Sequence, residues 1–163
     1  MTIRMIAPLE VGICCRDISK MRRFYEETLG FTFINEGAVA AENAAPLGLS
    51  AEGYTVVRLQ IPYGERIKLL ASNTPPAAET APAYLLEKPG ATYLTFIVDC
   101  IEATIKRLQG AGVTFTTGTA SLQVRPGVQV AFCRDPEGNA LELVQFADIS
   151  AYRPDLQKAD VSV

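Results

Sequence analysis

The sequence predicts an α+β fold in which two βαβββ modules form a curved, eight-stranded, cup-shaped sheet with helices on the outside. A strand, a helix and three more strands are expected in residues 1–74, and the same order returns in residues 90–147. Between them, residues 75–89 are rich in Pro and Ala and are typical of a stiff linker. One helix leaves a face of a four-stranded sheet uncovered, so pairing the modules in one domain buries it. Residues 148–163 are expected to form a surface tail.

A strand and a helix open the first module. Residues 7–15 are β-branched and bounded by Pro8 and Asp17, which favours a buried strand. Ser19 is the expected cap of the helix that follows. Its apolar side chains recur at spacings of three and four, at Met21, Phe24, Tyr25 and Leu29. Gly30 ends it as a residue suited to the left-handed conformation.

Three strands complete the first module. Residues 31–34 are read as a short strand, and residues 37–53 as a long loop of the kind that serves as a lid. Residues 54–61 and 66–72 alternate strongly and flank the turn formers of residues 62–65. This pattern predicts a hairpin.

The second module repeats the order of the first. A helix is expected over residues 101–108, ended by Gly110 and Gly112. The Pro and Gly of residues 134–138 fit a tight turn. Strands are expected at residues 91–98, 113–116, 128–133 and 139–146.

Composition excludes several classes of function. Of 163 residues, 48% are hydrophobic and 20% charged, which is typical of a soluble globular protein. A net charge of −3 lacks the basic excess expected of a nucleic-acid or anionic-membrane binder. The chain contains 0 histidines, so no imidazole can act as metal ligand or general base.

The cysteines indicate a cellular location. Cys14, Cys15, Cys100 and Cys133 form no CxxC pair, and no apolar leader or membrane-spanning run is evident. We therefore expect free thiols and a cytoplasmic protein.

Two groups of motifs carry a resemblance to a known family. They are Val11-Gly12-Ile13, Asp17, Phe24-Tyr25 and Leu29-Gly30-Phe31 in the first module, and Phe132-Cys133-Arg134-Asp135-Pro136-Glu137-Gly138-Asn139 with Leu141-Glu142-Leu143 in the second. Over residues 8–146 the chain resembles the vicinal oxygen chelate superfamily. This superfamily includes glyoxalase I, methylmalonyl-CoA epimerase, extradiol dioxygenases, and fosfomycin and bleomycin resistance proteins. The fold hosts several chemistries, so function must be argued from the site.

The resemblance implies metal ligands at four inward-facing strand positions, where this chain has Glu10, Lys68, Tyr93 and Glu142. Glu142 alone keeps the usual residue of the family. Because Lys68 is a cation at a ligand position, a divalent metal is disfavoured and no cofactor is expected. If a metal binds at all, Glu10 and Glu142 are its expected ligands.

Strand periodicity places further polar residues on the same faces. Every second residue of a strand shares a face, which groups Glu10 with Cys14, Lys68 with Arg66, and Tyr93 with Thr95. Tyr63 is a candidate aromatic contact at the hairpin turn. The predicted ligand-binding residues are Cys14, Arg58, Gln60, Tyr63 and Thr95.

The residue types favour proton transfer next to a carbonyl group of a small molecule. Glu10 and Glu142 are the predicted acid–base pair, and Lys68 and Tyr93 are expected to stabilise the enolate oxygen. This hypothesis describes a glyoxalase- or epimerase-like lyase or isomerase. Extradiol dioxygenase chemistry is excluded, because its iron site needs two histidines.

Two other interpretations stay open. In the first, Lys68 forms a half-buried triad with Glu10 and Glu142 that only supports folding, and removal of Lys68 is expected to cost ~3–5 kcal/mol because two carboxylates would lose their compensation. In the second, the protein is a non-catalytic binder of a small molecule, similar to the antibiotic-resistance branch of the superfamily. A homodimer is expected in either case, since the resemblance implies it.

Overall fold

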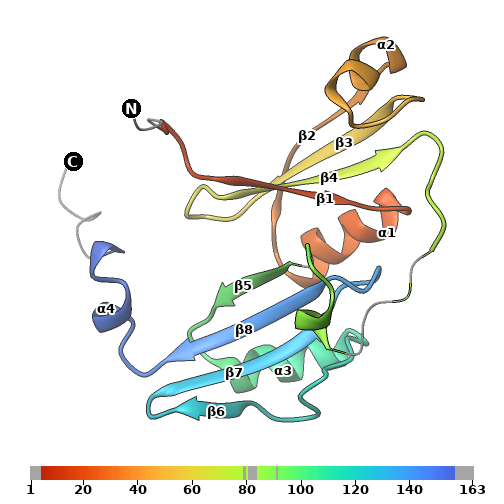
Figure 1. Ribbon diagram of the computed structural model, residues 1–163. Coiled ribbons are helices and arrows are strands. Elements are labelled where there is room, and N and C mark those ends of the chain that lie inside the picture. The colour runs from red at the N-terminus through yellow and green to blue at the C-terminus, as the bar shows by residue number, and fades with distance from the viewer. Residues whose placement is uncertain (1–4, 79, 81–83, 91, 157–163) are drawn as a thin grey trace. The chain divides into compact units, whose positions relative to one another are not determined.

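The computed structural model describes residues 5–78, 80, 84–90 and 92–156. The chain divides into two compact units, Met1–Thr80 and Ala81–Val163, and each contains one four-stranded mixed sheet (Figure 1). Both units follow the order strand, helix, strand, strand, strand. The α+β class and the repeated βαβββ module are therefore confirmed. In the part of the chain that the structure describes, no helix has the length and apolar character needed to cross a membrane.

The first sheet has the strand order β1-β4-β3-β2. Its strands are β1 (Glu10–Cys14), β2 (Thr32–Val39), β3 (Tyr54–Gln60) and β4 (Arg66–Ser72). β1 lies parallel to β4, and the other neighbours are antiparallel. Residues Ile67 and Leu69 of β4 and Leu59 of β3 are buried on one face, whereas their polar neighbours lie on the other. The alternation read from the sequence thus sets the two faces of this sheet.

Helix α1 (Ile18–Arg23) covers the apolar face of the first sheet and continues as a π-helical turn over Phe24–Thr28 (Figure 1). Met21 and Tyr25 are fully buried, and the Tyr25 ring makes edge contacts with Phe24 and Phe31. The predicted cap, Ser19, is wrong: the Asp17 side chain accepts the Lys20 N–H at 2.9 Å. Asp at this position caps as well as Ser, and it lies one residue before the helix.

The segment after α1 departs from the predicted short strand and long loop. β2 extends to Val39 because its pairing with β3 continues as far as Tyr54. The Ala-rich residues that follow form α2 (Ala41–Ala44) and a 3-10 turn at Ala45–Leu47. Alanine is the strongest helix former, which explains why part of the expected loop, residues 37–53, is helical.

The second sheet has the order β5-β8-β7-β6. Its strands are β5 (Tyr93–Ile97), β6 (Leu122–Arg125), β7 (Val128–Arg134) and β8 (Ala140–Phe146). Helix α3 (Ile101–Gly110) packs on one face through buried Ile101, Ile105 and Leu108 (Figure 1). Each module therefore uses one helix to cover one sheet face.

One predicted strand of the second module was misplaced. Residues 113–116 contribute a single bridge, Phe115 to Cys133, and the edge strand is β6 instead. All four residues of β6 are exposed, so it lacks the alternation that marks a half-buried strand. The signal that could have revealed it is the turn between β6 and β7, where Gly127 follows Pro126 with φ +75°.

The turn between β7 and β8 is built around one buried carboxylate. Asp135 is 5% exposed. It accepts the backbone N–H groups of Glu137 at 3.0 Å and Asn139 at 2.9 Å, and the Asn139 side-chain amide at 2.8 Å. These bonds fix the tight turn and give the Asp-Pro-Glu-Gly-Asn motif a structural role.

The linker and the tail contain short helices that the sequence did not predict. A 3-10 turn at Leu85–Glu87 lies in the linker, whose residues 79 and 81–83 are outside the described part. In the tail, Asp148 accepts the Ala151 N–H at 3.0 Å and caps α4 (Ile149–Tyr152). The predicted surface tail, residues 148–163, therefore contains one helical turn among its described residues.

Thiol accessibility follows from this packing. Cys14 and Cys100 are exposed, whereas Cys15 and Cys133 are buried. Burial, together with the nearby Asp135 carboxylate, raises the pKa of the Cys133 thiol to about 11.

At pH 8 we expect a thiol-reactive chromophore to modify the exposed Cys14 and Cys100 rapidly, and the buried Cys15 and Cys133 only after denaturation, because the thiolate is the reactive form. Four fast thiols in the native protein would contradict this packing.

Candidate functional site

The open face of the first sheet, opposite α1, carries a row of cationic side chains. Arg58 on β3 and Arg66 and Lys68 on β4 point to this face, and we call these three residues the cationic strip. β1 adds Glu10, whose register partner is Arg66. Three cations thus share the face with one carboxylate on β1.

Glu10 is paired with two cations of the strip. Its carboxylate oxygens lie 3.6 Å from Arg66 Nη1 and 3.6 Å from Lys68 Nζ. The side chains of Glu10 and Lys68 are each 34% exposed. The expected pair between Glu10 and Lys68 is present, but the charges are half exposed. The cost expected for breaking a buried pair therefore does not apply to this contact.

Arg58 differs from the other two cations because its hydrogen-bond partner is neutral. Its Nη1 donates to Asn35 Oδ1 at 3.0 Å, and Asn35 is its register partner on β2. On the other side its register partner is Lys68. Like charges directly opposite on neighbouring strands destabilise a sheet, by an amount comparable to the ~0.2–1 kcal/mol of a favourable pair.

The same open face becomes apolar toward one end. The register continues from Lys68 and Arg58 to Leu70 and Val56, and Val56 is 4% exposed. On β1, Cys14 is the partner of Leu70. Gly12 is opposite Lys68, and a Cβ there would come within 3.1 Å of Leu70 Cδ1. Because Val56 is buried, the apolar end of this face is accessible only in part of its width, at Leu70 and Cys14, next to the charged end.

The open face of the second sheet positions a carboxylate. Glu142 on β8 is half buried, and its Oε2 accepts the Thr95 hydroxyl at 2.7 Å. Thr95 and Phe132 are its register partners on the two neighbouring strands. The Tyr93 ring meets Phe132 edge-on at 5.6 Å between centroids. Glu142 thus has one oxygen fixed by a hydroxyl and aromatic neighbours beside it.

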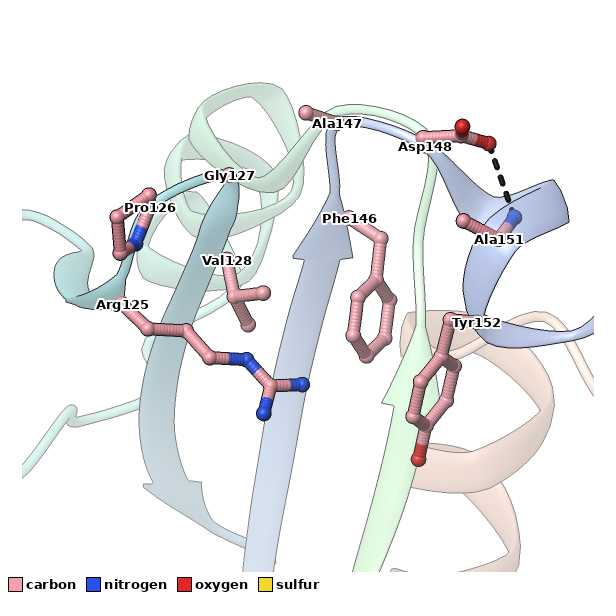
Figure 2. Close-up of a pocket in the computed structure, with 9 residues that line it drawn as sticks. All are labelled: Arg125, Pro126, Gly127, Val128, Phe146, Ala147, Asp148, Ala151 and Tyr152. Carbon is pink, nitrogen blue, oxygen red and sulfur yellow. Dashed lines mark hydrogen bonds between the residues drawn. The ribbon is translucent and has the colours of Figure 1, made fainter.

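A shallow cavity of about 370 Å³ lies at the end of the second sheet, where the β6–β7 turn faces α4 (Figure 2). The rings of Phe146 and Tyr152 stack there with their centroids 4.0 Å apart. Val128 lines the cavity from the neighbouring strand β7. Arg125 extends across Val128 (Figure 2). Sequence reasoning missed this cavity because α4 was not predicted. The aromatic residue Tyr152 in the tail was its one signal.

The structure groups the predicted site residues within each module. Glu10, Lys68, Cys14, Arg58 and Gln60 share the open face of the first sheet, as strand periodicity predicts. Gln60 also accepts the Arg66 Nε–H at 2.6 Å.

Three further predicted residues lie on the second sheet, and one lies in a turn. Tyr93, Thr95 and Glu142 share its open face. Tyr63 is 76% exposed in the turn between β3 and β4. The ligand-binding role of Tyr63 stays a prediction.

The residues at the ligand positions do not fit an ordinary divalent metal site. Among the described residues, no group of three or more His, Cys, Asp and Glu side chains is placed to hold an ion. Glu10 is already neutralised by two cations within 3.6 Å. A metal ion there would meet like-charge repulsion from the strip.

Two βαβββ modules with polar open faces define a protein of the vicinal oxygen chelate type. A family model confirms this class: the chain belongs to the Glyoxalase/Bleomycin resistance protein/Dioxygenase superfamily, whose model matches residues 7–143. A search of curated proteins found no significant match.

Solved structures agree on the fold. A glyoxalase family protein from Bacillus cereus is 20% identical, with a TM-score of 0.74 over 90% of this chain and 97% of that chain. A glyoxylase/bleomycin resistance protein/dioxygenase domain from Frankia sp. EAN1pec is 20% identical, with a TM-score of 0.63 over 88% and 93%. A glyoxalase I mutant from Zea mays is 18% identical, with a TM-score of 0.64 over 87% of this chain and 45% of that chain.

Replacing Lys68 by Met tests the half-exposed pair. We expect the variant to lose no more than ~1 kcal/mol in the free energy of unfolding, because an exposed ion pair contributes little and Arg66 still neutralises Glu10. Urea unfolding followed by circular dichroism measures the difference. A loss of ~3 kcal/mol or more would indicate a buried pair instead.

Proposed function

We propose that the protein is a lyase- or isomerase-type enzyme that moves a proton at a carbon next to a carbonyl group. The observation that carries the proposal is Glu142, a half-buried carboxylate held by the Thr95 hydroxyl at 2.7 Å. The fixed oxygen orients the carboxylate, and the second oxygen is then available to take a proton. Family membership supports the proposal, since glyoxalase I is one of the solved structures with this fold.

The proposed step breaks a C–H bond of the substrate. Glu142 takes the proton, and the electron pair left on carbon delocalises onto the carbonyl oxygen as an enolate. The Lys68 ammonium and the Tyr93 hydroxyl are the proposed donors to that oxygen. Glu10 is the proposed second acid–base group: in its protonated form it gives a proton to the carbon, and exchange with water then removes the proton from Glu142 and returns one to Glu10. The product differs from the substrate in the position or configuration of one hydrogen, so no electrons are gained or lost.

Replacing Glu142 by Gln tests the base. Gln keeps the size and the contact with Thr95 but cannot take a proton at neutral pH. The probes are a panel of small 2-oxo acids, 2-hydroxy acids and thiohemiacetals in D₂O. We expect the wild-type protein to exchange the hydrogen beside the carbonyl for deuterium in some of these compounds, and proton NMR measures the rate. The variant should exchange at least ~100-fold more slowly.

A control separates loss of chemistry from loss of folding. Glu102→Gln changes an exposed carboxylate on α3, which packs on the other face of the same sheet, and should leave exchange unchanged. Lys68→Met should also lower the exchange rate, because the ammonium is a proposed donor to the enolate oxygen. Equal exchange by the wild-type protein and Glu142→Gln would refute the assignment.

The proposed chemistry needs no divalent metal, because Lys68 supplies the positive charge beside the substrate oxygen. Protein purified without a histidine tag should contain well below one zinc, nickel, iron or manganese per chain by elemental mass spectrometry, before and after incubation with each ion. A tag must be absent because it would supply the imidazoles that the chain lacks. A metal bound near one per chain would contradict the metal-free mechanism.

A second candidate function is non-catalytic binding of a small molecule. The observation that favours it is the cavity beside Phe146 and Tyr152, whose stacked rings offer a flat apolar wall (Figure 2). A binder returns its ligand chemically unchanged, whereas the proposed enzyme exchanges or converts it. The D₂O assay therefore separates the two functions.

The proposal includes a cellular setting and an oligomeric state. Four free cysteines, two of them exposed, favour a reducing compartment such as the cytoplasm. A homodimer is proposed from the family resemblance. Sedimentation velocity measures its mass directly.

A further inference from the structure

The cationic strip combines like charges that a purely structural sheet would avoid. Arg58 and Lys68 are register partners on antiparallel neighbours, so their Cβ atoms are about 4.5–5.5 Å apart. Residues at such positions repel each other when both are cationic. When a sheet places like charges opposite each other at a cost in stability, a functional role is the expected reason.

The single carboxylate on β1 does not balance the strip. Glu10 lies at 3.6 Å from both Arg66 and Lys68, so one negative charge is shared by two cations. Arg58 donates to Asn35, which accepts the hydrogen bond but carries no charge. The open face of the first sheet therefore keeps an excess of positive charge around Arg58.

We propose that the cationic strip binds the anionic group of the ligand, a carboxylate or a phosphate. The proposal also takes this ligand to be the substrate of the proton-transfer reaction, and this identification rests on the proposed function. The planar guanidinium of Arg58 presents paired donors that match two oxygens of such a group. Lys68, opposite Arg58, supplies a second positive charge to the same group.

The apolar end of the same face narrows the ligand class. Leu70, which is partly exposed, continues the register beyond Lys68, and the exposed Cys14 lies beside Leu70. An anionic group at the strip would place the rest of the ligand over these side chains. The ligand class is therefore an anion with a short apolar part, and for the proposed enzyme an anionic carbonyl compound.

Substitution of Arg58 by Gln tests the strip with simple probes. Gln can keep the hydrogen bond to Asn35 but loses the charge. Isothermal titration calorimetry with malonate and with inorganic phosphate compares the two anion types, and neutral malonamide has the shape of malonate without its charge. We expect the wild-type protein to bind at least one anion and not malonamide, and Arg58→Gln to bind that anion about tenfold more weakly.

The matched control is Arg107→Gln, which removes an exposed guanidinium on α3 in the other module. It should leave anion binding unchanged when ionic strength is matched with sodium chloride. Without anion, Arg58→Gln should unfold at the same temperature as the wild-type protein or higher, because a repulsion has been removed. Binding of malonamide as tight as malonate, equal anion binding by Arg58→Gln, or no anion binding by the wild-type protein would overturn the inference.

The outcomes also separate this inference from the proposed function. Anion binding that depends on Arg58 without any hydrogen exchange in D₂O would support the strip as a binding site and count against the enzyme. Exchange that depends on Glu142 without anion binding would support the enzyme and overturn the strip. The two proposals therefore fail in different measurements.

Discussion

The packing of one helix on one face of each four-stranded sheet is the constraint on which the rest of the structure depends. Met21 and Tyr25 bury the apolar face of the first sheet, and Ile105 and Leu108 bury that of the second. Because side chains alternate along a strand, burying one set of residues forces the other set onto the open face. A register shift by one residue would turn Lys68 or Glu142 toward the helix, so the core fixes the position of the polar residues.

The open faces differ in electrostatic character. The first carries Arg58, Arg66 and Lys68 with Glu10, whereas Glu142 on the second is held by a neutral hydroxyl. Half exposure makes the ion pairs of the first face weak contributors to stability. A structural sheet gains nothing from opposed cations, so their presence on the open face supports the proposal that they bind a ligand.

Strand and face assignments could be predicted from the sequence, because alternation is strong where one face is buried. The predicted strand over residues 66–72 is confirmed as β4, and Glu142 lies on the face that periodicity assigns. Prediction failed where that signal is absent. β6 is an exposed edge strand without alternation, and α4 is a single turn capped by Asp148. The pairing of Glu10 with Arg66 was also missed, since cross-strand register depends on tertiary hydrogen bonding that spacing alone does not reveal.

A lysine at a strand position where the family resemblance implies a metal ligand changes what the scaffold can do. A divalent ion polarises a carbonyl with two charges and several open coordination sites, whereas an ammonium offers one charge and directional hydrogen bonds. In this chain Glu10 and Arg66 lie beside Lys68 and fix its surroundings, and Gly12 opposite it brings no side chain of its own. Electrostatic stabilisation of an enolate depends on charge placed in advance at the reacting oxygen. An ammonium fixed on a strand can supply it, so the absence of histidine from the chain is compatible with the proton chemistry proposed for Glu142.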